Sequence, residues 1–178
     1  MPRFRRTAFV IGGARSGKSR FAQELVEARP GRWVYLATAD RRDDGEMLDR
    51  IAAHRAGRGE RWRTVEEPLA LADALLRAAG DEVVLVDCLT LWLSNLMERG
   101  RAVEDATRAL ADAIARSRAA LVLVSNEVGQ GIVPVNPLAR RFRDDAGRLH
   151  QSVAAVVDDV FLVTAGLPLR LKPARDDD

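Results

Sequence analysis

The sequence has a single cysteine, Cys88, and no apolar run long enough to span a membrane as a helix. A lone cysteine cannot form a disulfide within the chain, and its place in an apolar run predicts a small buried side chain rather than a redox centre. A spanning helix needs about 20 consecutive apolar residues, and the apolar segment after the basic N-terminus is too short for a secretory signal. We therefore expect a cytoplasmic protein without a membrane span.

Lysine is scarce, and aromatic residues make up only 5% of the chain. The net charge is +2, from 28 basic and 26 acidic residues, and nothing in the sequence resembles a module that reads DNA or RNA. We therefore expect no nucleic-acid partner. Hydrophobic residues make up 47% of the 178 residues, which is enough for a sizeable core, so residues 1–178 are predicted to form one domain.

What the chain does contain is a complete phosphate-binding loop between an apolar strand and a helix. The pattern G-x-x-x-x-G-K-[ST] is filled without a mismatch by Gly12, Gly13, Ala14, Arg15, Ser16, Gly17, Lys18 and Ser19. Glycines let successive backbone N–H groups turn toward phosphate oxygens, and the following helix adds the positive end of its dipole. Lys18 is predicted to reach the β- and γ-phosphates, and the Ser19 hydroxyl to hold Mg²⁺. The chain is therefore predicted to bind a nucleoside triphosphate.

Short apolar runs alternate with helical patterns along the whole chain. Strands are predicted at 7–11, 33–37, 62–65, 83–86, 120–125, 160–164 and 167–171. Helices are predicted at 20–28, 45–56, 69–79, 91–98, 103–116 and 138–157. Continuous apolar strands separated by helices indicate a mostly parallel sheet that is covered on both faces. The last two strands are joined by almost no chain, so they must form an antiparallel hairpin. The fold class is therefore α/β.

Two further segments are expected at the edge of the sheet where ligands bind. The apolar run 83–86 ends in Asp87, and a carboxylate at that place holds the Mg²⁺ shell in P-loop folds. Thr90 follows closely and could cap the next helix or line the site; of the two, we expect capping. The polar, glycine-containing segment 124–134 begins at the end of another buried strand, so it is expected to lie beside the phosphate loop.

The two histidines have different surroundings in the sequence. His54 lies among Arg50, Arg55 and Arg58, whose positive charge favours the neutral, nucleophilic imidazole. The same arginines are suited to phosphate binding, but a run of charges is more often a solvated helix face, and the spacing alone favours that interpretation. His150 lies within a predicted helix, where a structural or surface role is expected.

Taken in order, these motifs resemble the bifunctional adenosylcobinamide kinase/adenosylcobinamide-phosphate guanylyltransferase family of cobalamin biosynthesis. The resemblance extends from Gly12 to Lys172, and its clearest stretch runs from Ser125 to Pro134. The other matching segments are 12–20, 35–39, 50–55, 62–66, 87–90, 95–96, 139–140, 142–144, Gly147 and Gln151. The resemblance implies a P-loop NTPase fold of the RecA-like kind and assembly as a homotrimer.

The resemblance also implies roles for individual residues. Family enzymes transfer GMP through a covalent guanylyl-histidine, and His54 stands where that histidine falls. Its imidazole would attack the α-phosphorus of GTP and expel pyrophosphate, which divides one difficult transfer into two easier steps. The matching nucleotide-binding positions are Ala37, Thr38, Ala39, Arg55, Ala56, Gly57, Arg58, Glu66 and Asp87.

In the family's other reaction, ATP or GTP phosphorylates the aminopropanol hydroxyl of adenosylcobinamide. Here the γ-phosphoryl group is transferred, so Lys18 and Mg²⁺ are expected to provide most of the electrostatic stabilisation of the charge on its oxygens. The product, adenosylcobinamide phosphate, is then the acceptor of GMP. Adenosylcobinamide, its phosphate and nucleoside triphosphates are thus the expected binding partners, with Mg²⁺ as cofactor.

One position departs from the family pattern, which usually carries Asn where this chain has His150. His150 is therefore a second possible nucleophile, ranked far below His54. Two other functions stay open at this point: a P-loop small-molecule kinase without guanylyl transfer, and a nucleotide-gated binding protein. A covalent nucleotide on the chain would exclude the first, and transfer to cobinamide would exclude the second.

Overall fold

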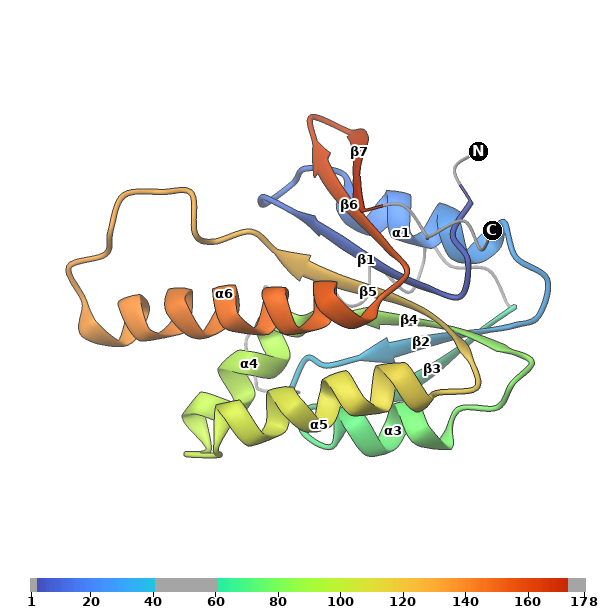
Figure 1. Ribbon diagram of the computed structural model, residues 1–178, viewed down its shortest axis with the longest axis horizontal. Helices are drawn as coiled ribbons and strands as arrows, with labels where there is room; N and C mark the ends of the chain where they lie inside the picture. Colours follow the sequence, from blue (N-terminus) through green and yellow to red (C-terminus); the bar gives the residue numbers. More distant parts are fainter. Residues whose placement is uncertain (1–2, 41–60, 173–178) are drawn as a thin grey trace.

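The structure, a computed structural model, describes residues 3–40 and 61–172. Within these residues the centre is a seven-stranded sheet with the order β3-β2-β4-β5-β1-β6-β7 (Figure 1). β7 is antiparallel to its neighbour β6, and the other neighbouring pairs of the described sheet are parallel. The strands are β1 (Thr7–Gly12), β2 (Arg32–Ala37), β3 (Trp62–Glu66), β4 (Glu82–Asp87), β5 (Ala120–Asn126), β6 (Asp159–Thr164) and β7 (Leu167–Lys172).

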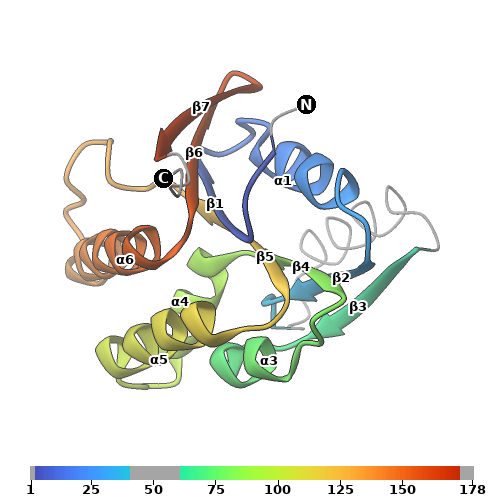
Figure 2. The ribbon, with the colours of Figure 1, turned by 45° about the vertical axis from the view of Figure 1, so that its right-hand side comes forward.

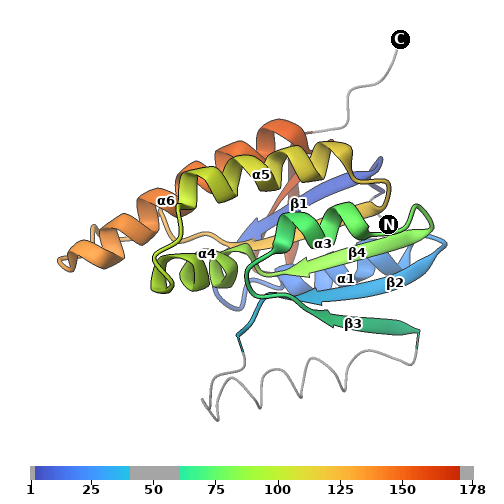
Figure 3. The same cartoon turned by 90° about the horizontal axis from the view of Figure 1, so that it is seen from below.

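Helices lie on both faces of this sheet (Figure 2). One face carries α1 (Lys18–Glu27), and the opposite face carries the remaining helices of the described chain (Figure 3). These are α3 (Leu71–Arg77), α4 (Leu89–Glu98), α5 (Val103–Arg116) and α6 (Pro137–Val156). The predicted layered α/β architecture is therefore confirmed.

The central strands are apolar on both sides because each side meets a helical layer. Val10 of β1 belongs to the same buried cluster as Phe21 of α1. Its neighbour Phe9 belongs to the opposite cluster, with Leu149 of α6. Successive side chains of a strand point to opposite faces, so a strand between two layers needs apolar residues at every position. This is why the strands read as continuous apolar runs in the sequence.

The two strands that carry the predicted phosphate and metal groups, β1 and β4, are not neighbours in the sheet. β5 lies between β1, which leads into the loop, and β4, which ends at Asp87. Neighbouring strands are about 4.8 Å apart, so the ends of β1 and β4 are separated by roughly 10 Å. The parallel strands end at one edge of the sheet, which is the edge where open α/β sheets bind ligands.

Most elements form where the sequence predicts them, including the antiparallel hairpin of β6 and β7. The helices begin or end within about two residues of the predicted bounds, a usual uncertainty for helix termini. The predicted helix at 45–56 lies outside the described residues. In the part of the chain that the structure describes, no helix has the length and apolar character needed to cross a membrane.

Candidate nucleotide-binding and phosphoryl-transfer site

The eight residues of the predicted phosphate loop, Gly12 to Ser19, form the turn between β1 and α1. Gly17 precedes α1 with a left-handed backbone (φ 93°), a conformation that favours glycine. Gly12 has no room for a side chain, because an added Cβ would lie 2.5 Å from the Val163 carbonyl oxygen and 2.6 Å from Ser16 Oγ. The glycines of the motif therefore serve two purposes, a tight turn and a close approach to β6.

Two polar side chains of the loop are buried in a place suited to an anion. Lys18 is 8% exposed, and its Nζ donates a hydrogen bond of 3.1 Å to the Gly13 carbonyl oxygen. Ser16 Oγ is buried and has no hydrogen-bond partner within the described residues. An unpaired buried hydroxyl is costly, so a ligand oxygen that accepts its hydrogen bond would be favoured. The N-terminus of α1 adds unsatisfied backbone donors, so the arrangement fits phosphate.

The β6–β7 turn supports the loop from the side. The Gly166 N–H donates a hydrogen bond of 2.8 Å to the Ser16 carbonyl oxygen. Gly166 also packs against Gly17, where an added Cβ would lie 3.1 Å from the Gly166 Cα. The antiparallel hairpin at the end of the chain thus helps to fix the shape of the phosphate loop at its beginning. Nothing local in the sequence indicates this contact.

Asp87 lies at the end of β4, where the sequence predicts it. The Tyr35 hydroxyl donates a hydrogen bond of 2.9 Å to Asp87 Oδ2 and so orients the carboxylate. Magnesium prefers oxygen ligands and usually takes one or two from the protein, with phosphates and water completing its shell. Asp87 and the Ser19 hydroxyl at the start of α1 supply such oxygens on the two sides of β5. The donor set therefore fits Mg²⁺ bound together with a triphosphate.

The ends of β2, β3 and β4 place three predicted nucleotide-binding residues in one row. In the register of the sheet, Ala37 pairs with Glu66 on one side and with Asp87 on the other. Thr38 is fully buried, and its Oγ1 donates a hydrogen bond of 2.7 Å to the Cys88 carbonyl oxygen. The segment 37–39 is therefore fixed against β4, whereas Glu66 is exposed on β3, four strands from β1.

The segment after β5 lies beside the phosphate loop, as predicted. Asn126 pairs with Gly12 in the sheet register, and the Glu127 N–H donates a hydrogen bond of 2.9 Å to the Gly12 carbonyl oxygen. The Asn126 amide also donates to Thr90 Oγ1 over 2.9 Å. The expectation that Thr90 caps α4 is wrong, because the residue before that helix is Cys88 and no side chain caps it. The Thr90 hydroxyl instead links the first turn of α4 to the end of β5.

Cys88 is buried, as predicted, and lies 3.1 Å from Thr90 Oγ1 through its sulfur. Burial raises the pKa of the Cys88 thiol, and the adjacent Asp87 carboxylate raises it further. The thiol is therefore protonated at neutral pH. A protonated, buried thiol is a poor nucleophile, which supports the interpretation of Cys88 as a packing residue.

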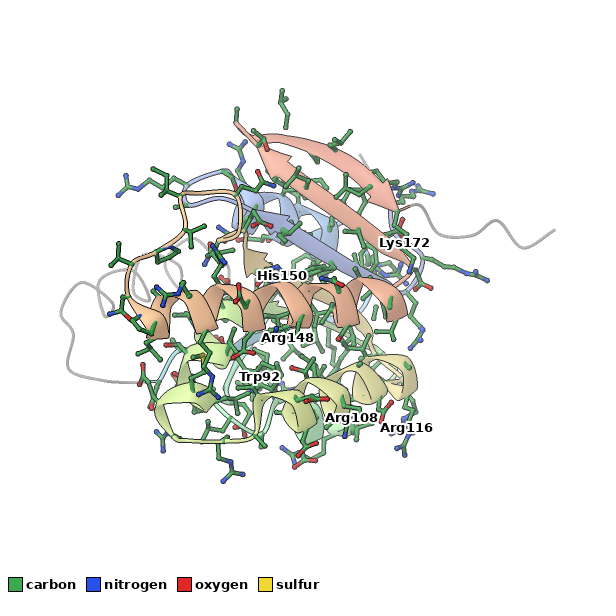
Figure 4. The ribbon with its side chains drawn as sticks, turned by 60° about the vertical axis from the view of Figure 1, so that its left-hand side comes forward. Trp92, Arg108, Arg116, Arg148, His150 and Lys172 are labelled. Atoms are coloured by element: carbon green, nitrogen blue, oxygen red, sulfur yellow. The ribbon has the colours of Figure 1, made fainter. Side chains whose placement is uncertain are left out.

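His150 is also buried, on the side of α6 that faces β5 (Figure 4). Its Nε2 lies 2.8 Å from the hydroxyl of Ser125, which is itself inaccessible to solvent, and its ring packs on Phe9. Burial lowers the pKa of His150, although the charge of Glu127 partly opposes the shift. The ring is therefore neutral but enclosed. Its suggested role as a second nucleophile is not supported, and the structural role is.

Five of the predicted site residues, His54, Arg55, Ala56, Gly57 and Arg58, lie outside the described residues. Three residues that contribute to the site had no assigned role in the sequence: Tyr35, Asn126 and Glu127. Glu127 carries a signal like that of Asp87, because it closely follows an apolar strand. Tyr35 has no such signal, since only the pairing of β2 with β4 brings it to Asp87.

Comparison with known proteins agrees with this geometry. A family model described as cobinamide kinase / cobinamide phosphate guanyltransferase matches residues 8–171. The bifunctional adenosylcobalamin biosynthesis protein CobP of Pseudomonas aeruginosa is 46% identical over 166 residues, covering 92% of this chain and 95% of that protein. The bifunctional adenosylcobalamin biosynthesis protein CobU of Salmonella typhimurium is 43% identical over 180 residues, covering 92% of this chain and 98% of that protein.

Solved structures with little sequence similarity share the fold. The flagellar accessory protein FlaH from Methanocaldococcus jannaschii has a TM-score of 0.50 and 12% identity, and the match covers 94% of this chain and 78% of FlaH. An ATPase of a bacterial type III secretion system has a TM-score of 0.55 and 12% identity, covering 93% of this chain and 56% of that ATPase. These likenesses confirm the P-loop fold. With the family match over residues 8–171, they lead to one conclusion: the chain belongs to the cobinamide kinase/cobinamide phosphate guanyltransferase family.

Proposed function

We propose that this chain phosphorylates adenosylcobinamide with ATP or GTP and then transfers GMP from GTP to adenosylcobinamide phosphate, releasing pyrophosphate. The observation that carries the proposal is the family match over residues 8–171, which includes a complete phosphate loop. The geometry is consistent with both reactions, because the loop and the end of β4 form one edge at which a triphosphate can be held.

In the kinase reaction, the loop N–H groups and the start of α1 hold the β- and γ-phosphates. Lys18 places a positive charge beside them, and the unpaired Ser16 hydroxyl offers a further hydrogen bond. Ser19 and Asp87 would hold Mg²⁺, which supplies positive charge to offset the charge that builds on the phosphate oxygens. These groups act on the transferred phosphoryl group and the leaving diphosphate, not on the acceptor.

In the guanylyl reaction, the His54 imidazole attacks the α-phosphorus of GTP and pyrophosphate leaves. The phosphate of adenosylcobinamide phosphate then attacks the same phosphorus and frees the imidazole. We propose that Arg55, Ala56, Gly57 and Arg58 contact the nucleotide beside His54. We further propose that the row formed by 37–39, Glu66 and Asp87 contacts the rest of the nucleotide.

We also propose that the protein is a cytoplasmic homotrimer. Nucleoside triphosphates are cytoplasmic substrates, and the resemblance implies the trimer. The loop between β5 and α6, residues 127–136, supports an assembly because its apolar side chains Ile132 and Val135 are 98% and 93% exposed, and exposed apolar surface is costly in water. Light scattering on the wild type should give three times the chain mass, and Ile132→Asp with Val135→Asp should lower it. A monomeric wild type would contradict the trimer.

The test of the transferase function is covalent labelling. The wild type, His54→Ala and His150→Asn are each incubated with Mg²⁺ and α-labelled GTP, denatured and separated from free nucleotide. We expect an acid-labile, alkali-stable label on the wild type and on His150→Asn, but not on His54→Ala. His150→Asn is the matched control, because it removes the chain's other histidine.

The outcomes separate the candidate functions. Label on His54→Ala would move the nucleophile to another residue. Absence of label from every protein, with phosphorylation of adenosylcobinamide intact, would leave a kinase without guanylyl transfer. Absence of both, with nucleotide binding intact, would leave a nucleotide-gated binding protein.

A further inference from the structure

The two proposed reactions differ in the chemical group of the acceptor that attacks phosphorus. In the kinase step the acceptor is a hydroxyl, which must lose a proton as its oxygen bonds to the γ-phosphorus. In the guanylyl step the acceptor is a phosphate that is already an anion at neutral pH. A group that accepts a proton is therefore needed in the first reaction and not in the second. This inference rests on the proposed function and asks which residue takes that proton.

The carboxylates that end the strands at the ligand edge differ in their distance from the phosphate loop. Among the described residues, Glu66 ends β3, four strands from β1, which is roughly 19 Å at about 4.8 Å per strand. Asp87 ends β4, two strands away from β1. It accepts a hydrogen bond from Tyr35 and is already proposed as a metal ligand. Glu127 follows β5, the strand paired directly with β1.

Two other acidic residues of the described chain lie just beyond strand ends, and both have structural partners. Asp40, after β2, forms an ion pair with Arg99 over 2.5 Å. Glu67, after β3, accepts hydrogen bonds from the backbone N–H groups of Leu69 and Ala70 near the start of α3. Neither is therefore placed to receive a proton beside the phosphate loop. Glu127 is the carboxylate that the topology brings to it.

Glu127 is held at both its backbone and its side chain. Its N–H donates a hydrogen bond of 2.9 Å to the carbonyl oxygen of Gly12, the first residue of the loop. Its Oε1 accepts a hydrogen bond of 2.5 Å from the Gly129 N–H. Within the described residues no hydrogen bond reaches the second carboxylate oxygen, and the side chain is only half-buried. One oxygen is thus anchored while the other is available to a substrate.

His150 is the titratable neighbour of this carboxylate. His150 is close enough for the charge of Glu127 to raise its pKa, but burial lowers that pKa more. A neutral imidazole that is engaged with Ser125 forms no ion pair with Glu127, and no other ion pair of Glu127 is found in the described part of the chain. No cationic side chain of the described residues therefore occupies the carboxylate of Glu127, and it stays accessible to an acceptor hydroxyl.

We propose that Glu127 is the general base of the kinase step. The acceptor oxygen forms a bond to the γ-phosphorus, and the bond from that phosphorus to the β–γ bridging oxygen breaks. Its electron pair leaves with the nucleoside diphosphate, and the proton of the acceptor hydroxyl moves to the free carboxylate oxygen of Glu127. Lys18 thus stabilises the charge on the phosphates, and Glu127 accepts the proton of the acceptor hydroxyl.

The test uses the two activities of one chain as internal controls. Glu127→Gln keeps an oxygen that accepts the Gly129 N–H, so the turn is preserved while the base is removed. We expect kcat for phosphorylation of adenosylcobinamide to fall about 10²- to 10⁴-fold, with KM for the nucleotide unchanged. Guanylyl transfer to supplied adenosylcobinamide phosphate should stay within about twofold of the wild type, because that acceptor needs no base.

Two further variants separate the base from a structural role. Glu127→Asp keeps a carboxylate but shortens its reach, so its kinase kcat should lie between those of the wild type and Glu127→Gln. Glu104→Gln, a change of the same kind on the exposed face of α5, should leave both activities unchanged. Thermal unfolding of each variant shows whether the fold is retained.

Three results would overturn the assignment. Equal loss of both activities in Glu127→Gln would make Glu127 a structural residue of the site. An unchanged kinase kcat would place the base elsewhere. A wild type that does not phosphorylate adenosylcobinamide would defeat the proposed function and, with it, the need for a base. That last result is distinguishable from the others because it is seen before any substitution is made.

Discussion

The hydroxyl of Tyr35 on β2 donates a hydrogen bond of 2.9 Å to the carboxylate of Asp87 at the end of β4. The contact orients the residue that we propose as a metal ligand. Loss of such a hydrogen-bond partner typically lowers metal affinity about 10- to 100-fold. Tyr35→Phe removes the donor and keeps the ring. We expect the Mg²⁺ concentration for half-maximal kinase activity to rise about 10-fold.

The measurement is a Mg²⁺ titration of the kinase rate at saturating nucleotide. Thermal unfolding of Tyr35→Phe in the absence of metal should differ little from the wild type, which separates metal binding from folding. An unchanged Mg²⁺ requirement would mean that Asp87 does not depend on Tyr35, or that Asp87 is not a metal ligand.

The phosphate loop offers a matched pair of glycines. An added Cβ at Gly12 would lie 2.5 Å from the Val163 carbonyl oxygen, whereas nothing lies within 4 Å of an added Cβ at Gly13. Gly12→Ala should therefore lower the free energy of unfolding by about 1–3 kcal/mol, the usual cost of overpacking, and Gly13→Ala should lower it little. Chemical denaturation of both variants without nucleotide measures this difference. Equal stabilities would show that β6 moves aside for a methyl group.

How far the sequence predicts this molecule depends on how local each signal is. The loop from Gly12 to Ser19 and the apolar run ending in Asp87 are continuous in the chain, so their structures follow from neighbouring residues. The support that Gly166 gives to Ser16 joins residues far apart in the chain, and only the position of β6 beside β1 creates it.

The same reason explains the one expectation for the site that is wrong. Thr90 near the start of a predicted helix is typical of a cap, which is a local interaction. Its hydroxyl instead meets the Asn126 amide because β4 and β5 are neighbours in the sheet. Glu127 lies in a segment that the sequence places beside the loop, but it received no role of its own, because its hydrogen bond to Gly12 depends on the direct pairing of β5 with β1.

His150 should make stability depend on pH. Burial lowers its pKa below the usual value near 6.5, so the folded protein binds this proton less tightly than the unfolded chain does. Unfolding therefore takes up a proton below about pH 6.5, and the contribution of neutral His150 to stability, complete above that value, is lost as the pH falls toward the folded pKa. The loss can reach about 1.4 kcal/mol per pH unit.

The variant that tests this is His150→Asn, which keeps a polar side chain toward Ser125 but does not titrate. Denaturation between about pH 7.5 and pH 5.5 should show a steeper loss of stability for the wild type than for the variant. The difference between the two slopes isolates His150 from the other titrating groups. Parallel slopes would mean that the pKa of His150 is the same in the folded and unfolded states, so that burial does not shift it.

Lys172, at the end of β7, stabilises the far end of α6 (Figure 4). Its Nζ donates hydrogen bonds to the carbonyl oxygens of Ala154, Ala155 and Val157, over 2.8, 3.2 and 2.6 Å. The last carbonyls of a helix have no partner within it and carry the negative end of its dipole. Lys172→Met should therefore lower the free energy of unfolding by about 1.5–3 kcal/mol, the range for hydrogen bonds to a charged group.

The control is Arg116→Met, in the last turn of α5. Its charge also lies near a helix C-terminus, but no hydrogen bond of its side chain to a carbonyl is found in the described residues. Arg116→Met should cost at most about 1 kcal/mol, because only the dipole interaction is lost. If both variants lost the same stability, general electrostatics would account for the effect of Lys172. A larger loss for Lys172→Met alone would assign it to the three carbonyls, and so to the link between the last strand and α6.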